Sequence, residues 1–321
     1  MAVTRNSLSA NLPDRVGDFL ATRLLPGERL WVGLSGGCDS VVLLHALSTL
    51  GLGDRASAMH VHHDLSPNAD AWGEFCLAYC KRLGIPLVIS YVKVMLAAGQ
   101  GLEAAARKAR YAAFAECPGD SLLLAQHRGD QAETLLLNLL RGAGVTGAAA
   151  MPAERKLGKL RLLRPLLDVS RVEIEAYALE NGLDWVDDES NADISLTRNY
   201  LRHEVLPAMT RRFPAAEAAL AQATVNFSEA SGLLDELAAF DWSQVAEGSA
   251  ARLAGLRELS LPRTKNLLRY RLRILGWQVP VATRLDEFVR QLQSAGPDRH
   301  PELVLPDGKL RAARGLLHWL S

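Results

Sequence analysis

Between residues 29 and 142 the sequence alternates four times between a short apolar run and a longer helical segment. The runs are bounded by turn-forming residues and are apolar nearly throughout, which is typical of strands buried on both faces. They cover residues 29–34, 56–63, 85–92 and 120–127, and the helical segments cover 40–50, 68–84, 101–117 and 130–142. The alternation predicts an α/β fold in which helices cover both faces of a doubly wound parallel sheet.

Polar clusters stand at the carboxyl ends of three of these runs. They are Ser35–Ser40, His60–His63 and Gln126–Asp130. Ligands of open α/β sheets bind beyond the carboxyl ends of the strands, so the three clusters are expected to form one site.

The first cluster, Ser35-Gly36-Gly37-Cys38-Asp39-Ser40, connects a predicted strand to a predicted helix. Glycines let backbone N–H groups approach an anion, and the helix N-terminus adds positive potential. The loop has neither the Gly-Lys-Ser/Thr ending of a Walker A loop nor the G-x-G-x-x-G of a dinucleotide site. It is read as a phosphate cradle, and the alternative is a glycine-rich turn that only caps a helix.

The pattern changes after residue 150, and the tail becomes basic. Residues 251–321 hold 13 Lys and Arg against 6 Asp and Glu, although each kind totals 36 in the chain. We expect residues 1–212 to form the α/β domain, 213–245 a helical linker, and 246–321 a smaller, basic, mainly helical domain with a hairpin at Asp307-Gly308. The basic tail indicates either nucleic-acid contact or merely a solvated surface.

The cysteines point to a reducing compartment. None of Cys38, Cys76, Cys80 and Cys117 forms a C-x-x-C pair, the first residues do not resemble a secretory leader, and no apolar run approaches about 20 residues. The sequence therefore predicts a cytoplasmic protein with free thiols and no membrane partner. It leaves the oligomeric state open, and a homodimer is compatible with it.

The S-G-G-x-D-S loop after the first strand resembles the signature of the PP-loop ATP-pyrophosphatase superfamily, whose fold is Rossmann-like. Four further blocks resemble, in order and spacing, those of the tRNA(Ile)-lysidine synthetase family. They are His60–Trp72, Gly101–Tyr111, Ala125–Gly144 and Asp184–Pro207. Longer members of that family carry another C-terminal domain. The chain therefore resembles a short form of the family, either a natural one or a truncated one.

The resemblance implies an ATP-dependent ligase acting on an isoleucine tRNA with a CAU anticodon. ATP, with Mg²⁺, would adenylate the C2 oxygen of the wobble cytidine. Free L-lysine would then attack C2 through its ε-amine, releasing AMP and leaving lysidine. The loop Ser35, Gly36, Gly37, Cys38, Asp39 and Ser40 would hold the phosphates, and the domain of residues 246–321 would bind the tRNA.

Three carboxylates are the main catalytic candidates. Asp39 would bind Mg²⁺ or orient the cytosine, although it could also only cap a helix. Asp130 and Glu133 are three residues apart on one helix face, where they would bind lysine and help to deprotonate its amine. Their alternative role is a favourable interaction with the helix dipole.

Basic residues complete the candidate site. The resemblance assigns Arg107, more than Arg110, to the ATP phosphates, where a guanidinium would neutralise charge on the α-phosphate. The expected contacts to nucleotide or tRNA are His60, His63, His127, Arg198, Asn199 and Arg202. Solvated helix faces are the alternative for the arginines, and the histidine spacing does not support a zinc site.

The sequence departs from the family pattern at two places. Gln126 stands where the family often has the first of two histidines, and the second strand ends His60-Val61-His62-His63-Asp64. Two alternative functions remain at this point: a PP-loop tRNA thiolase, which would need sulfur-handling cysteines, and a nucleotide-binding sensor without catalysis. The retention of Asp39, Asp130 and Glu133 disfavours the sensor.

Overall fold

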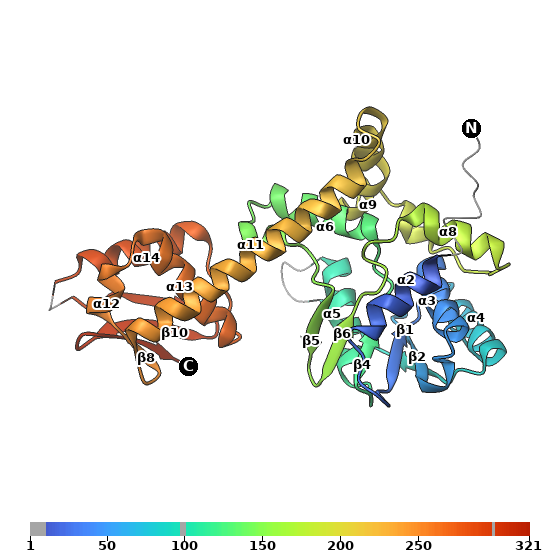
Figure 1. Ribbon diagram of the computed structural model, residues 1–321, viewed down its shortest axis with the longest axis horizontal. Helices are drawn as coiled ribbons and strands as arrows, with labels where there is room; N and C mark the ends of the chain where they lie inside the picture. The colour runs from blue at the N-terminus through green and yellow to red at the C-terminus, as the bar shows by residue number, and fades with distance from the viewer. Residues whose placement is uncertain (1–10, 97–100, 297–298) are drawn as a thin grey trace. The chain divides into compact units, whose positions relative to one another are not determined.

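The computed structural model describes residues 11–96, 101–296 and 299–321 and divides into two compact units. The units are residues 1–226 and 227–321, and helix α11 (Ala216–Val245) runs through the division (Figure 1). The division therefore falls inside the segment 213–245 that the sequence marks as a helical linker. None of the helices in the described ranges combines the length and the apolarity needed to cross a membrane.

The N-terminal unit is built on a six-stranded sheet with the order β3-β2-β1-β4-β6-β5. All neighbours pair in parallel except β5 and β6, which form an antiparallel hairpin at one edge. The strands are β1 (Leu30–Gly33), β2 (Ala56–His62), β3 (Leu87–Tyr91), β4 (Ser121–Leu123), β5 (Glu154–Leu157) and β6 (Leu160–Leu163). The parallel sheet is confirmed, and the β5–β6 hairpin is an addition that the sequence did not predict.

The four helices expected between residues 29 and 142 are present with ends shifted by up to two residues. They are α3 (Cys38–Thr49), α4 (Ala69–Leu83), α5 (Leu102–Ala115) and α6 (Arg128–Leu140). The unit also contains α2 (Leu12–Ala21), α7 (Val145–Ala148), α8 (Arg171–Glu180), α9 (Thr197–Tyr200) and α10 (Leu206–Arg212). A π-helical turn, η3 (Leu201–Val205), joins α9 to α10, and short 3₁₀ turns lie at Gly53–Arg55 and Glu189–Ala192.

Alternate residues of β1 serve two hydrophobic cores, one on each face of the sheet. Leu30 and Val32 pack with α3 and α8, whereas Trp31 packs with Phe114 of α5. This arrangement is expected for a strand covered on both faces, because successive side chains point to opposite sides. Helix α3 is buried on most sides, and the doubly wound arrangement predicted from the alternation is confirmed.

Strand β1 lies at the point where the strand order reverses. From β1 the chain proceeds outward through β2 and β3, then returns to add β4 on the opposite side of β1. The loops that follow β1 and β4 therefore diverge at their carboxyl ends and leave a crevice there. The segment Leu34–Gly37 follows β1, and Gln126–His127 follows β4, so two of the predicted polar clusters meet at this crevice.

The C-terminal unit has its own core and its own antiparallel sheet. The sheet order is β7-β8-β11-β10-β9, and Leu267, Leu268, Phe288 and Leu310 are among the core residues. Its elements are β7 (Ala246–Glu247), β8 (Ala250–Arg252), α12 (Leu253–Glu258), α13 (Leu261–Ile274), α14 (Ala282–Ser294), β9 (Glu302–Leu305), β10 (Gly308–Ala313) and β11 (Leu316–Leu320). Strands β9 and β10 are the hairpin expected at Asp307-Gly308, and the remaining strands extend it into a sheet.

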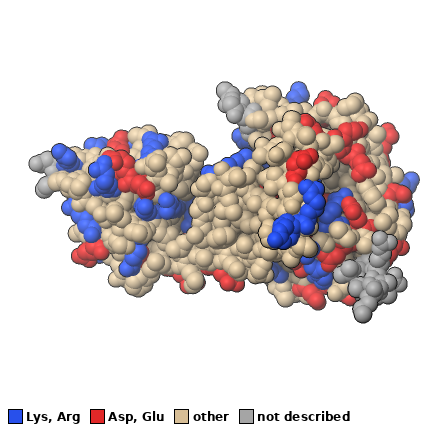
Figure 2. Space-filling model, turned by 90° about the horizontal axis from the view of Figure 1, so that it is seen from above, with Lys and Arg blue, Asp and Glu red and all other residues tan. Residues whose placement is uncertain are grey.

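Much of the positive charge of this unit is paired within it. Arg263 pairs with the buried Asp241 of α11, Arg273 pairs with Asp235, and Lys265 Nζ lies 3.0 Å from Asp286 Oδ1. The guanidinium of Arg271 lies 3.8 Å from the ring centre of Trp242. In Figure 2 the Lys and Arg atoms of this unit, at the left, lie among Asp and Glu atoms. The basic composition thus serves packing as well as surface charge.

Glu28, just before β1, provides a test of how the N-terminal sheet is held together. Its carboxylate is 5% exposed and accepts hydrogen bonds from Arg161 Nη2 at 2.8 Å and from Ser121 Oγ at 2.7 Å. Burial raises the pKa of Glu28, but these hydrogen bonds outweigh it and hold the pKa below the ordinary value of 4.5. Its stabilisation is therefore present above that ordinary value and is lost as the pH falls through the lowered pKa.

We expect Glu28→Gln to lower the free energy of unfolding of the N-terminal unit by about 2 kcal/mol at neutral pH. The difference from wild type should shrink as the pH falls below about 4. Urea unfolding over a pH series measures both effects. Glu154→Gln is the matched control, because Glu154 pairs with the same Arg161 at 3.3 Å but is 39% exposed, and it should cost less than about 1 kcal/mol.

Candidate active site

The loop after β1 is held by its own serines. The Oγ atoms of Ser35 and Ser40 lie 3.1 Å apart, Ser40 Oγ donates to Gly37 O at 2.9 Å, and Gly37 N–H donates to Ser35 Oγ at 3.3 Å. Helix α3 begins at Cys38, with Gly37 as its extended N-cap residue. The helix N-terminus therefore opens at the loop, as a phosphate cradle requires.

Gly36 meets two constraints at once. Its φ of +88° is one that side chains rarely tolerate, and an added Cβ would lie 2.7 Å from Val186 Cγ2. Val186 also donates its N–H to Gly36 O at 3.0 Å. The segment around Val186, which precedes α9, thus packs directly on the loop, and only glycine fits between them.

Cys38 takes no part in the polar chemistry of the loop. It points into the core with 2% exposure, and burial raises the pKa of its thiol to about 12. Cys76, Cys80 and Cys117 are also buried and free, with thiol pKa values raised to about 12, 11 and 11 by burial. Such thiols are protonated and unreactive at neutral pH.

Asp39 lies in the first turn of α3 and faces Arg171, the first residue of α8. Arg171 Nη1 lies 2.6 Å from Asp39 Oδ1, and Arg171 Nε donates to Glu175 Oε1 at 2.7 Å. Burial raises the pKa of Asp39, although His127 and Arg171 oppose the shift. The sequence analysis did not identify Arg171. Its only local signal is its place after Ser170, whose capping box with Glu173 starts α8.

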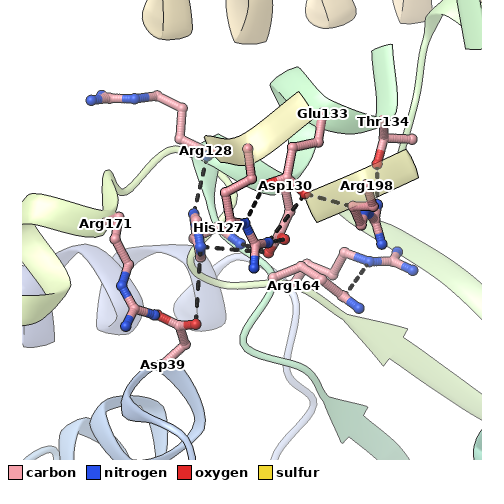
Figure 3. A network of polar contacts seen from close by, with 12 residues as sticks. Asp39, His127, Arg128, Asp130, Glu133, Thr134, Arg164, Arg171 and Arg198 are labelled. Carbon is pink, nitrogen blue, oxygen red and sulfur yellow. Dashed lines mark hydrogen bonds and ion pairs between the residues drawn. The ribbon is translucent and has the colours of Figure 1, made fainter. Parts of the chain in front are cut away.

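His127 lies between Asp39 and Asp130, as Figure 3 shows. Its Nδ1 accepts the N–H of Gly129 at 3.0 Å, so the neutral ring carries its proton on Nε2. Nε2 lies 3.9 Å from Asp39 Oδ2 and 3.8 Å from Asp130 Oδ2. The histidine thereby links the loop after β1 to the start of α6.

Asp130 and Glu133 share one face of α6, as predicted, and they are paired with Arg198 and Arg202. Arg202 forms a two-pronged contact with Glu133, Nε–Oε1 at 2.6 Å and Nη2–Oε2 at 3.1 Å, and reaches Asp130 Oδ1 at 3.2 Å. Arg198 Nε lies 3.2 Å from Glu133 Oε2 but is not aligned for a hydrogen bond, so this contact is an ion pair only. Two carboxylates thus face two guanidinium groups in one cluster, which we call the α6 charge cluster.

Burial affects the two carboxylates differently. At Asp130 burial is outweighed by His127, Arg202 and Arg198, and the pKa falls below its ordinary value. At Glu133 burial and the charge of Asp130 raise the pKa, in spite of the close Arg202 guanidinium. Glu133 is therefore the carboxylate of the pair that accepts a proton more readily.

The two arginines predicted to bind the ATP phosphates have different neighbours. Arg110 Nε donates to His63 Nε2 at 3.2 Å, while Arg107 Nη2 donates to Tyr111 Oη at 3.2 Å. The two arginines therefore point to different neighbours. Burial, followed by the charge of Arg110, lowers the pKa of His63 to about 4, so its ring is neutral.

His60 and Asn199 are already engaged with the protein. His60 is buried, with Nδ1 at 3.0 Å from Leu34 O. The Asn199 amide donates to Ser190 O at 2.7 Å and Asp193 O at 3.0 Å. These contacts position the loop after β1 and the 3₁₀ turn at Glu189–Ala192, respectively.

The crevice combines three chemical capacities. The loop offers an anion cradle, Asp39 offers a carboxylate beside it, and the α6 charge cluster offers paired charges of both signs. No group of three or more acidic, His or Cys side chains in the described ranges could hold a metal ion alone. Asp39 nevertheless fits Mg²⁺, since this ion is commonly held by one or two carboxylates, waters and substrate phosphates.

These features define a PP-loop domain, a class of ATP-using α/β proteins, and the comparisons agree. Residues 8–209 match the family described as PP-loop domain, and residues 252–318 match the TilS substrate binding domain. The chain is 44% identical to the tRNA(Ile)-lysidine synthase of Nitrosomonas europaea over 325 residues, covering 100% of this chain and 71% of that protein. It is 47% identical to the one of Aromatoleum aromaticum over 292 residues, covering 90% and 68%. The chain belongs to the tRNA(Ile)-lysidine synthase family, which is a family of enzymes.

A solved structure supports the fold independently. The U34-tRNA thiolase NcsA from Methanococcus maripaludis, with its [4Fe-4S] cluster, superimposes with a TM-score of 0.57. It is 17% identical and covers 70% of this chain and 80% of its own. The likeness concerns the fold alone.

We expect Gly36→Ala to weaken ATP binding at least about tenfold, because the added Cβ displaces either Val186 or the loop. Isothermal titration with ATP measures this effect, and Val186→Ala in the same chain should restore part of the affinity by removing the clash. Gly51→Ala is the control, since Gly51 has a φ of +69° but nothing within 4 Å of an added Cβ. It should cost about 1 kcal/mol of stability and leave ATP binding unchanged.

Proposed function

We propose that this chain is a ligase that joins L-lysine to the wobble cytidine of the isoleucine tRNA with a CAU anticodon, using ATP. The observation that carries the proposal is the continuity of the crevice: the phosphate loop, Asp39, His127 and the α6 charge cluster follow one another by direct contacts. The match of the chain to the family over its length supports the same reaction. We place the protein in the cytoplasm with its tRNA.

The first step is adenylation of the base. The C2 oxygen attacks the α-phosphorus of ATP, the bond to the β-phosphate breaks, and pyrophosphate leaves. The loop residues 35–40 bind the departing pyrophosphate with backbone N–H groups and serine hydroxyls. Asp39 would hold Mg²⁺, which supplies positive charge to the phosphates when bound. To do so, Asp39 would either give up its ion pair with Arg171 or bind the ion through Oδ2 while Oδ1 stays paired with Arg171.

The second step is attack by lysine. The ε-nitrogen forms a bond to C2, one of its protons is lost, and the C2–O bond breaks as AMP leaves. Only the neutral amine is nucleophilic, so a proton acceptor is needed. Glu133 suits this role because burial raises its pKa above the ordinary value of 4.5, whereas the pKa of Asp130 is lowered.

The α6 charge cluster fits an amino acid because a free amino acid is itself a zwitterion. Its ammonium groups can contact Asp130 and Glu133, and its carboxylate can contact Arg198 or Arg202. This assignment extends the predicted lysine site, since Arg198 and Arg202 were expected to contact nucleic acid. For the domains, we propose adenylation by residues 1–212, a linker at 213–245 and tRNA binding by 246–321.

The direct test is incubation of the protein with ATP, labelled lysine and the CAU isoleucine tRNA, followed by nuclease digestion. Label in the wobble nucleoside, with AMP and pyrophosphate formed in equal amounts, is the expected result. Pyrophosphate release that does not depend on lysine and tRNA, or no release at all, would contradict the proposal and favour a sensor.

Separate substitutions should separate the two steps. We expect Asp39→Asn to lower kcat at least about 100-fold with little change in ATP affinity, because its charge acts mainly in the transition state. Glu133→Gln should raise the KM for lysine at least about tenfold and also lower kcat, because it removes a charge that binds an ammonium and the group that accepts the proton. Steady-state kinetics with each substrate varied measures both, and unchanged lysine kinetics in Glu133→Gln would remove that residue from the lysine site.

Thiolation is the second candidate, because the NcsA structure shares the fold. A thiolase needs reactive sulfur, whereas the four thiols here are buried with raised pKa values. We expect replacement of all four by Ala or Ser to leave lysidine formation within a few-fold of wild type, with circular dichroism verifying the fold. Loss of chemistry in a folded variant would favour thiolation.

A further inference from the structure

Three arginines from three elements surround Tyr111 of α5. The guanidinium carbon of Arg107 lies 4.9 Å from the centre of the Tyr111 ring, and that of Arg155 on β5 lies 5.0 Å from it. Arg164, the residue after β6, lies close enough to interact with Tyr111 and with both other arginines. We call Arg107, Arg155 and Arg164 the Tyr111 arginine cluster.

The charge of this cluster is not balanced by carboxylates. No Asp or Glu of residues 11–96, 101–296 and 299–321 forms an ion pair with any of the three guanidinium groups. Their hydrogen bonds go to neutral groups instead: Arg164 Nε donates to Gln126 Oε1 at 2.8 Å and Arg164 Nη1 to Pro152 O at 2.6 Å. In the α6 charge cluster, by contrast, the arginines face two carboxylates.

Burial makes this imbalance costly. Arg164 is 2% exposed, and burial together with the charges of Arg155 and Arg107 lowers its pKa. Burial raises the pKa of Tyr111, but the neighbouring arginines outweigh it and bring the pKa below its ordinary value. The positive charge of neighbouring arginines contributes to both shifts, after burial in the case of Arg164. A bound anion removes such repulsion, and arginine forks match the oxygens of phosphate groups.

Like the phosphate loop, the cluster lies at the carboxyl ends of the parallel strands, but beside different strands. Arg155 sits on β5, and β4 and β6 separate β5 from β1, which carries the loop. At about 4.8 Å per strand, β5 lies roughly 14 Å from β1 across the sheet. The strand that carries Arg155 is therefore well separated from the strand that carries the phosphate loop.

We propose that the Tyr111 arginine cluster is a second phosphate site, which binds a backbone phosphodiester of the tRNA next to the nucleotide that reacts. The inference rests on the proposed function for the identity of the RNA. The proposal differs from the resemblance, which assigns Arg107 to the ATP phosphates. Phosphoryl oxygens of ATP and of RNA have the same chemistry, so the experiment measures binding of both. Arg155 is the residue to change, because it is exposed on an edge strand and its loss does not leave a buried charge unpaired.

The test compares Arg155→Gln with Lys156→Gln. Lys156 is the next residue on β5, is also exposed, and points to the opposite face of the strand, so the control removes the same charge. Binding of the CAU isoleucine tRNA is measured from about 50 to 300 mM salt, and ATP binding is measured in parallel. We expect Arg155→Gln to weaken tRNA binding about three- to tenfold, to reduce the salt slope by about 1, and to leave ATP binding within twofold. Lys156→Gln should show a smaller effect on both RNA quantities.

A neutral linkage identifies the phosphate itself. Anticodon stem-loops that each carry one uncharged methylphosphonate linkage are titrated with wild type and with Arg155→Gln. One linkage near the wobble nucleotide should weaken binding to wild type but not to the variant. Equal losses at every linkage would overturn the site, and weakened ATP binding with unchanged tRNA binding would assign the cluster to ATP instead.

These readouts are independent of turnover. If one neutral linkage weakens binding to wild type but not to Arg155→Gln, and no lysidine forms, the phosphate site stands and the proposed function is contradicted. If lysidine forms but no linkage shows this difference, the proposed function stands and the phosphate site is contradicted.

Discussion

Two carboxylates on α6, the buried Glu133 and the half-buried Asp130, impose the constraint on which the rest of the site depends. A carboxylate removed from water is costly unless a cation and hydrogen bonds accompany it. Asp130 and Glu133 obtain these from Arg198 and Arg202, which lie more than 60 residues later in the chain. The π-helical turn that carries Arg202 is held against α6 by this pairing. The preceding segment is thereby kept at the phosphate loop, where Val186 contacts Gly36.

Because the charged groups of the site are already paired with one another, a charged ligand has to replace one of these ion-pair partners. Asp39 is paired with Arg171, and the carboxylates of α6 are paired with Arg198 and Arg202. A substrate that carries both charges can replace such contacts without leaving a buried charge alone, whereas a simple cation or anion cannot. The pairing therefore supports the proposal that this cluster binds a zwitterionic amino acid.

The sequence predicted the parts of the fold that depend on local pattern. The alternation of apolar runs gave the parallel sheet, and the spacing of Asp130 and Glu133 placed both on one helix face. It could not predict partners distant in the chain, so Arg171 was missed, and the pairing of Arg198 and Arg202 with the carboxylates of α6 was not foreseen. The expected contact of these two arginines with nucleotide or tRNA stays a prediction. The β5–β6 hairpin was missed because six of its ten residues, 154–163, are charged or glycine. Counting charges in the tail could not show that Arg263 and Arg273 pair with α11.

The distribution of arginines along the sheet edge separates two kinds of positive charge. Arginines that face acids, such as Arg202 and Arg171, fix the geometry of the protein and leave little net potential. Arginines that face only neutral groups, as around Tyr111, leave potential that a ligand can use. The loop after β1 is the proposed pyrophosphate cradle, and the unbalanced arginines on β5 and after β6 are the proposed second anion site. An enzyme that uses ATP to join an amino acid to an RNA needs a site for each of the three, and the order of the strands separates the two proposed anion sites.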